Sequence, residues 1–124
     1  MAKAKESFTI KKRFNSFGYA FTGIKTLLNS EHNSWIHLAA TILVVAAGLI
    51  FHISIESWLM LTIAIALVWI TEAMNTAVEY LVDLTSPDLH PIAKKAKDVA
   101  AAAVLIASIA AIIIGILVLL NEVK

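Results

Sequence analysis

The last long apolar stretch constrains the fold of this chain more than any other feature, because it runs from Val99 to Leu120 without a charged residue. At about 22 residues, it is long enough to cross a hydrocarbon layer of about 30 Å as a helix. Two more apolar stretches precede it, Trp35 to Ile55 and Trp58 to Val82. Backbone groups in lipid must be hydrogen-bonded within the protein, so all three stretches are predicted to be helices. We therefore expect an all-α membrane protein with spans at about 35–55, 58–82 and 99–120.

The composition agrees with a membrane protein and excludes several other classes. Hydrophobic residues make up 60% of the chain and charged residues 15%, whereas a soluble domain is about 45–50% apolar and about 25% charged. The net charge of +1 and the apolar excess exclude a nucleic-acid-binding module and a disordered tail. The absence of cysteine excludes a disulfide scaffold, a thiolate metal site and a cysteine nucleophile. Because no repeat or linker divides residues 1–124, they are expected to form one domain.

Residues 8–30 are predicted to form an amphipathic helix that lies in the membrane interface. Apolar residues recur at helical spacing through this segment, and basic and polar residues fall between them. The apolar positions are Phe14, Phe17, Phe21, Ile24 and Leu28, and the residues between them include Lys11, Lys12, Asn15, Thr22 and Lys25. Such a helix places its basic residues near anionic headgroups. A soluble helix that packs on a partner is the alternative interpretation.

The distribution of lysine and arginine predicts the orientation of the chain in the membrane. Six such residues precede the first span, and three lie in the loop before the third, at Lys94, Lys95 and Lys97. The first turn, around Ser54 to Ser57, has none, and Lys124 is alone at the C-terminal end. By the positive-inside rule, the N-terminus and the second loop are cytoplasmic. The first turn and the C-terminus are then expected on the outer side.

The second span carries acidic residues at a depth where a membrane helix normally has none. To cross the membrane it must include Glu72, Asn75 and Glu79, because its purely apolar part is too short. At about 100° per residue, these three residues and Asp83 fall on one narrow stripe of the helix. An ionised carboxylate inside a bilayer costs about 2.5–3.5 kcal/mol. The stripe therefore predicts a functional site in which a cation, a metal ion, a proton or a partner helix compensates the charge; the alternative is a hydrogen-bonded cluster that holds an oligomer together.

Further acidic and basic residues are expected at the same level of the membrane. Glu31 precedes the first span, and Asp98 lies at the start of the third. Carboxylate oxygens are the ligands that Mg²⁺ prefers, and the ion is usually held by one or two carboxylates plus substrate phosphates. The basic residues that could bind phosphate are Lys12, Arg13, Lys94 and Lys97. Acids for a metal, bases for phosphate and a lipid interface together predict phosphoryl transfer, although the chain has no glycine-rich nucleotide loop.

Several segments give the chain a resemblance to a known family. The run from Glu72 to Asp83, EAMNTAVEYLVD, resembles the E-x-x-N-[ST]-A-[IV]-E-x-x-x-D signature of the small prokaryotic diacylglycerol kinase family, which includes undecaprenol kinases. The segment from His90 to Val104 looks like the A-K-D-x-x-x-A-A-V segment of that family. Arg13 to Gly23 and Glu31 to His37 are also similar, so the resemblance covers nearly the whole chain.

The resemblance implies a fold, a reaction and a set of site residues. The fold is a surface helix plus three transmembrane helices in a bacterial inner membrane, assembled as a homotrimer with active sites shared between protomers. The reaction moves the γ-phosphoryl group of MgATP directly to a lipid hydroxyl. Glu72 would be the general base, and Glu31 and Glu79 would hold Mg²⁺. The implied nucleotide contacts are Tyr19, Asn75, Asp88, His90, Lys97 and Asp98, with either Lys12 or Arg13 contacting phosphate.

The resemblance also bears on the lipid substrate. Asn33 and His37 follow the branch that looks like undecaprenol kinases, and Arg13 fits the Gram-positive branch of the family. We therefore expect undecaprenol to be the preferred substrate and undecaprenyl phosphate the product; the alternative is diacylglycerol, which would give phosphatidic acid. A more remote alternative is a non-enzymatic ion or proton conductor built around Glu72 and Glu79.

Overall fold

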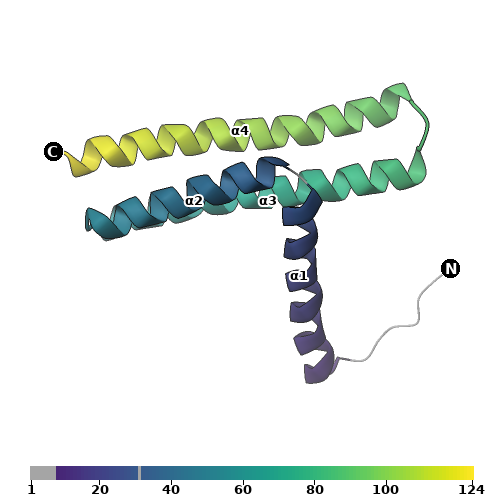
Figure 1. Ribbon diagram of the computed structural model, residues 1–124, viewed down its shortest axis with the longest axis horizontal. Helices are drawn as coiled ribbons and strands as arrows, with labels where there is room; N and C mark the ends of the chain where they lie inside the picture. Colours follow the sequence, from purple (N-terminus) through teal and green to yellow (C-terminus); the bar gives the residue numbers. More distant parts are fainter. Residues whose placement is uncertain (1–7, 31) are drawn as a thin grey trace.

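A computed structural model of the chain describes residues 8–30 and 32–124. These residues form four helices, α1 (Ile10–Ser30), α2 (His32–Ile50), α3 (Ile55–Thr85) and α4 (Pro91–Glu122), and they contain no strand. Helices α3 and α4 run antiparallel side by side, α2 lies along the first half of α3, and α1 leaves the bundle at a steep angle (Figure 1). The all-α prediction is confirmed, and α2, α3 and α4 are each long and apolar enough to cross a membrane.

The lengths of these three helices decide which parts can lie in lipid. At about 1.5 Å per residue, the 31 residues of α3 and the 32 residues of α4 extend about 46 and 48 Å. Both exceed the hydrocarbon core of about 30 Å, whereas the 19 residues of α2 extend only about 28 Å. Because α2 lies beside the end of the bundle that holds the C-terminus, α3 and α4 project beyond it at the opposite end, where they are connected (Figure 1).

The turn between α2 and α3 comes earlier in the chain than expected. Helix α2 ends at Ile50, and the chain reverses through His52, whose φ of 50° lies in the left-handed region. The Ser54 side chain then accepts a hydrogen bond from the backbone N–H of Ser57 and caps α3. The sequence predicts the turn around Ser54 to Ser57, but Ser54 caps the helix, which already starts at Ile55.

The connection between α3 and α4 consists of residues 86–90. The Ser86 backbone N–H donates to the Val82 carbonyl and closes the last turn of α3. The Nδ1 atom of His90 accepts a hydrogen bond from the Ile92 N–H at 3.1 Å and caps α4. Pro91 is the first residue of α4, a position that suits proline because the first N–H of a helix has no intrahelical partner.

The described residues bury nearly as many polar as apolar side chains and expose a largely apolar surface, unlike a soluble protein. The buried polar residues in the described ranges are Ser34, Ser57, Glu72, Asn75 and Thr76. The buried apolar side chains are few, and most large ones on α2, α3 and α4 are exposed. An apolar surface of this extent is stable in contact with lipid or with partner chains. The burial pattern therefore agrees with the three apolar spans.

Glu122 joins α4 to the first turn of α3 at the end of the bundle that holds the C-terminus. Its Oε1 atom accepts hydrogen bonds from the Ser54 N–H at 2.9 Å, the Ser54 hydroxyl at 2.7 Å and the Ser57 hydroxyl at 2.6 Å. The carboxylate therefore lies at a helix N-terminus, where free N–H groups and the helix dipole favour a negative charge. At the opposite end, Lys97 Nζ donates to Asp83 Oδ1 at 2.6 Å. The two contacts fix the register of α3 against α4.

Helix α2 approaches the start of α3 closely at Gly48. A Cβ atom added to this buried glycine would lie 2.6 Å from Cη2 of Trp58 and 3.1 Å from Cδ1 of Ile53. Atoms at such distances must move apart, so the Trp58 ring occupies space that only glycine leaves open.

The Gly48→Ala variant is expected to be less stable than the wild type, because its methyl group must displace the Trp58 ring. Overpacking of this kind typically costs about 1–3 kcal/mol, which thermal unfolding of the purified protein in detergent would detect. Gly115→Ala is the matched control, because a Cβ atom there meets nothing within 4 Å. Equal unfolding midpoints for the two variants would contradict the close approach of α2 to α3.

Candidate active site

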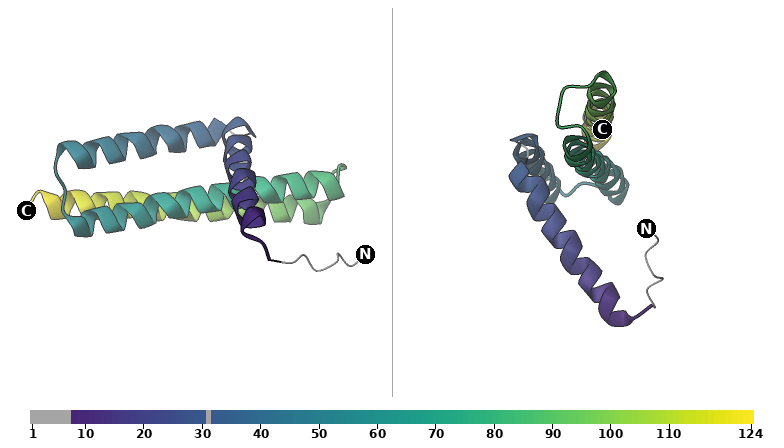
Figure 2. Two further views of the ribbon diagram at one scale, coloured as in Figure 1. Left: turned by 90° about the horizontal axis from the view of Figure 1, so that it is seen from below. Right: turned by 90° about the vertical axis from the view of Figure 1, so that its right-hand side faces the viewer.

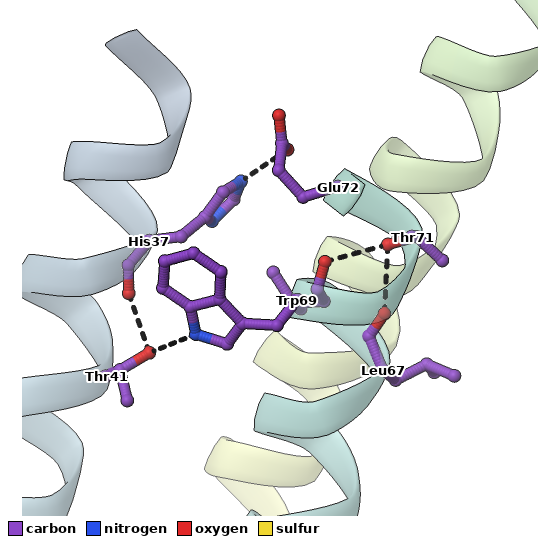
Figure 3. Close-up of polar contacts among 7 residues, drawn as sticks. His37, Thr41, Leu67, Trp69, Thr71 and Glu72 are labelled. Carbon is purple, nitrogen blue, oxygen red and sulfur yellow. Dashed lines mark hydrogen bonds and ion pairs between the residues drawn. The ribbon is translucent and has the colours of Figure 1, made fainter. Parts of the chain in front are cut away.

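Glu72 lies on α3 and is the most deeply buried charged residue in the described ranges, with 1% of its surface exposed. Its Oε2 atom lies 3.2 Å from Nε2 of His37 on α2 (Figure 3). The two atoms are at ion-pair distance, but Oε2 does not meet the geometry of a hydrogen bond with any described residue. Glu72 is therefore a carboxylate withdrawn from water, with the imidazole of His37 beside one of its oxygens.

The His37 ring packs against Trp69 of α3, and the Trp69 ring is in turn bonded to Thr41 of α2. The Trp69 indole N–H donates to Thr41 Oγ1 at 3.0 Å, and the Thr41 hydroxyl donates to the His37 carbonyl at 2.7 Å (Figure 3). The His37 and Trp69 rings meet edge to face, with centroids 6.3 Å apart and an interplanar angle of 69°. These contacts limit the positions that the imidazole can adopt beside Glu72.

Further buried or half-buried polar residues lie on the same parts of α2 and α3 as His37 and Glu72. We call this set the polar seam: Ser34, His37 and Thr41 on α2, and Glu72, Asn75 and Thr76 on α3. Ser34 Oγ, Asn75 Oδ1 and Thr76 Oγ1 are buried and have no hydrogen-bond partner among the described residues. Each unsatisfied buried group costs about 1–3 kcal/mol. The polar seam is therefore a place where a further polar group would be stabilised.

The acidic stripe of α3 runs from Glu72 to the end of the helix that connects to α4. Glu79 lies about two turns, or about 10 Å, beyond Glu72 and is half-buried, whereas Asp83 is exposed. Besides donating a hydrogen bond to Asp83, the Lys97 ammonium is attracted by the negative charge of Glu79. Lys97 therefore places a positive charge of α4 beside the end of the stripe that is nearest the α3–α4 connection.

A hollow of about 210 Å³ lies at the α3–α4 connection. Its lining includes four residues that the resemblance assigns to nucleotide contacts, Asp88, His90, Lys97 and Asp98. Lys94 also lines the hollow, and its Nζ atom lies 2.5 Å from Asp98 Oδ2. The structure thus brings both ammonium and carboxylate groups together where α3 and α4 project beyond α2. Such a mixture can bind phosphates together with a hard cation.

Helix α1 does not bring its expected site residues beside Glu72 within a single chain. The Arg13 guanidinium lies 5.0 Å from the centre of the Phe8 ring, in the part of α1 that projects away from the other helices (Figure 2). Lys12 belongs to the same part of the helix, and Tyr19 is 75% exposed. The phosphate and nucleotide contacts expected from α1 are therefore separated from the polar seam in one copy of the chain.

An apolar groove, which we call the α2–α4 groove, runs along α2, α3 and α4 from His37 to the end of the bundle that holds the C-terminus. It consists of two adjoining hollows of about 290 and 510 Å³, which share Val44, Leu61 and Gly115 as lining residues. His37 lines the first hollow and Glu122 the second. The groove can therefore take an apolar chain whose one end reaches the residue that contacts Glu72.

The described carboxylates suit a metal ion that arrives with phosphate. Within residues 8–30 and 32–124, no group of three or more histidine and acidic side chains is placed to hold a metal by itself. Mg²⁺ normally needs only one or two carboxylates, because phosphate oxygens and water complete its coordination. Glu79, half-buried between the polar seam and the hollow, meets this requirement. Glu31, the other expected ligand, lies outside the described residues.

The surroundings of Glu72 contain residues that the sequence-based expectations do not include. Ser34, Thr41 and Trp69 have no assigned role there, and His37 serves only as a marker of a family branch. Ser34, His37 and Thr41 follow the spacing i, i+3 and i+7, which places them on one face of a helix. Polar residues at this spacing in an otherwise apolar span are the signal that would have indicated a contact with another helix.

Comparison with known proteins gives matches along most of the chain. The family described as prokaryotic diacylglycerol kinase matches residues 18–119. An undecaprenol kinase of Bacillus subtilis (strain 168) is 37% identical over 113 residues, which are 91% of this chain and 92% of that protein. A diacylglycerol kinase of Synechocystis sp. is 41% identical over 101 residues, 81% of this chain but only 58% of that protein. A diacylglycerol kinase of Escherichia coli (strain K12) is 31% identical over 96 residues, 77% of this chain and 79% of that protein.

The burial of Glu72 can be tested by labelling, because the chain has no native cysteine. A cysteine at position 72 is expected to react with a water-soluble maleimide much more slowly than a cysteine at position 83, because Asp83 lies on the same helix but is exposed. Both variants should react equally fast after unfolding in sodium dodecyl sulfate. Equal rates in the folded protein would show that water reaches position 72 freely.

Proposed function

This chain belongs to the prokaryotic diacylglycerol kinase family and is a lipid kinase, and we propose that it transfers the γ-phosphoryl group of ATP to undecaprenol. The observation that carries this proposal is the position of Glu72, a carboxylate buried beside the inner end of an apolar groove. A base for a lipid hydroxyl has to lie where that hydroxyl can reach it without leaving the membrane. Glu72 does not itself line the groove, but His37, which lies 3.2 Å from it, does. We infer that the lipid hydroxyl passes this imidazole to reach the carboxylate.

In the proposed reaction, the lipid chain lies in the α2–α4 groove and its hydroxyl lies beside Glu72. The carboxylate accepts the hydroxyl proton while the hydroxyl oxygen forms a bond to the γ-phosphorus. The bond between the γ-phosphorus and the β–γ bridging oxygen breaks, and ADP leaves. Phosphoryl transfer needs mainly positioning and charge stabilisation from the protein, so a chain without a glycine-rich loop can carry it out.

We assign the Mg²⁺ ligands to Glu79 and Glu31. When bound, the ion neutralises charge on the β- and γ-phosphate oxygens. Support for Glu79 comes from its half-buried position between Glu72 and the ion pair of Asp83 and Lys97. A nucleotide in the hollow at the α3–α4 connection would extend its phosphates toward this residue.

The nucleotide contacts in this proposal come mainly from the hollow at the α3–α4 connection. Asp88, His90, Lys97 and Asp98 already lie around it. Lys97 would exchange its hydrogen bond with Asp83 for one with a phosphate oxygen, which is a stronger partner because it carries more charge. The buried Asn75 lies one turn from Glu72 and would contact the terminal phosphate.

Sites shared between copies of the chain would complete this arrangement. The expected contacts of Lys12 or Arg13 with phosphate, and of Tyr19 with the nucleotide, are distant from the polar seam in one chain. In a homotrimer, the α1 helix of one copy would reach the site of its neighbour. The apolar residues that remain exposed on α2, α3 and α4 supply surface for such contacts.

The choice of undecaprenol over diacylglycerol is supported by the extent of the sequence matches. The undecaprenol kinase aligns with 91% of this chain and over 92% of its own length, whereas the diacylglycerol kinase with 41% identity aligns over 58% of its own length. Diacylglycerol is the alternative substrate. An ion conductor built around Glu72 and Glu79 has no support from these relatives, whose names all describe kinases.

We further propose that the N-terminus and the α3–α4 connection face the cytoplasm of a bacterial cell and that the C-terminus lies outside. Lys94, Lys95 and Lys97 lie near this connection, as the positive-inside rule requires. This orientation places the charged hollow on the side where ATP is present. The α2–α3 turn and Glu122 would then lie at the outer face of the membrane.

The Glu72→Gln variant is expected to lose lipid phosphorylation by at least about 10²-fold, the usual contribution of general-base catalysis. Transfer of radiolabel from γ-labelled ATP to extracted lipid measures the turnover. Glu56→Gln is the matched control, because Glu56 is an exposed carboxylate in the first turn of the same helix. Near-normal turnover by Glu72→Gln would exclude Glu72 as the base.

A competition assay tests the lipid preference. Purified protein with MgATP is given equal mole fractions of undecaprenol and diacylglycerol in mixed micelles, and both phosphorylated products are quantified. We expect undecaprenyl phosphate to accumulate faster. Faster formation of phosphatidic acid would identify diacylglycerol as the preferred substrate instead. Cation flux in liposomes without phosphorylation of either lipid would favour the ion conductor.

A further inference from the structure

We propose that His37 is a positioning residue for Glu72: in the reacting complex its Nε2–H group donates to one carboxylate oxygen, which in the structure lies at ion-pair distance but outside hydrogen-bond geometry. The bond then directs the other carboxylate oxygen toward the lipid hydroxyl. This inference rests on the proposed kinase reaction. The starting observation is that Glu72 Oε2 lies 3.2 Å from His37 Nε2, while Figure 3 shows the other carboxylate oxygen pointing away from the imidazole. The two oxygens of Glu72 therefore have different surroundings.

His37 is fixed well enough to act in this way. Its backbone carbonyl accepts from Thr41, which in turn accepts from the Trp69 indole, and its ring meets the Trp69 ring edge to face. Trp69 lies one turn before Glu72 on α3. The imidazole therefore lies beside two residues of the same helix, the ring of Trp69 and the carboxylate of Glu72. A shift of α2 along α3 would therefore disturb the imidazole and the carboxylate together.

The position of His37 links Glu72 to the lipid side of the site. His37 lines the α2–α4 groove and has 17% of its side chain exposed, whereas Glu72 has 1%. A hydrogen bond to one oxygen of a carboxylate restricts rotation of the whole group. The Nε2–H group is present in one neutral tautomer and in the imidazolium form, so the positioning role does not require a change of charge.

Two substitutions separate positioning from simple packing. His37→Leu keeps an apolar side chain of moderate size but removes the N–H donor, whereas His37→Gln retains an N–H donor on its side-chain amide. His52→Asn is the control, because His52 is an exposed histidine in the distant α2–α3 turn and asparagine tolerates its left-handed φ. The readouts are kcat, the KM for MgATP and the thermal unfolding midpoint, measured with undecaprenol in mixed micelles.

We expect kcat of His37→Leu to fall about 10- to 100-fold, as for the loss of a hydrogen bond to a charged group. The KM for MgATP should stay unchanged, and His37→Gln should recover much of kcat. A kcat of His37→Leu equal to that of the wild type, or an equal loss in the Leu and Gln variants, would overturn the proposal. If the wild type phosphorylates no lipid, the kinase reaction itself is wrong.

A second variant covers the case in which His37→Leu does not fold. Thr41→Val removes the hydroxyl that joins Trp69 to the His37 carbonyl but leaves the imidazole present. We expect a smaller fall in kcat with an unchanged KM for MgATP, because the Trp69 ring that packs against the imidazole is then held less firmly. An unchanged kcat in Thr41→Val would also overturn the proposal.

Discussion

Burial of the Glu72 carboxylate costs free energy that the residues around it have to offset, since its charge has lost most contact with water. The imidazole of His37 lies 3.2 Å from the carboxylate, and its ring meets Trp69, whose indole N–H donates to Thr41. Three more polar atoms of the seam are buried without partners among the described residues. A packed interior that served stability alone would have apolar residues here. The arrangement is understandable when a polar substrate group completes it.

The excess length of α3 connects this buried carboxylate to water. Glu72, Glu79 and Asp83 follow one another along one face, and their exposure rises from buried to half-buried to exposed. Asp83 lies about 16 Å along the helix axis from Glu72, beside the hollow that contains Lys97 and Asp98. A single helix face therefore extends from membrane depth to the charged hollow at the α3–α4 connection, and in the proposed reaction it would serve both a lipid alcohol and a nucleotide. This is the geometric requirement of a kinase whose two substrates come from different phases.

Much of this organisation could be predicted from the sequence because it depends on local periodicity and length. Apolar stretches long enough to cross a membrane predict α2, α3 and α4, and helical spacing predicts the stripe that contains Glu72. Contacts between positions far apart in the sequence could not be predicted. A threonine has the same sequence pattern whether its hydroxyl bonds within its own helix or to another helix. Thr62 donates within its own helix to Trp58, whereas Thr41 also accepts from Trp69 of another helix. The contact of Glu122 with the first turn of α3 joins the end of the last span to the start of the second span. These segments are far apart in the sequence, so the contact has no local sequence signature.

The position of α1 shows why the remaining site residues need more than one chain. Its last turns are attached to α3, where the Ser30 and Tyr80 hydroxyls lie 2.5 Å apart and Leu27 is buried. Its first turns, with Arg13, extend away from the bundle (Figure 2). A helix fixed at one end moves its other end only by bending or by breaking those contacts. Under the proposed mechanism, Arg13 acts in the site of a neighbouring copy, so α1 needs neither to bend nor to break its contacts with α3. The attachment of α1 to α3 keeps Arg13 away from the site of its own chain and would direct it toward the site of the neighbour.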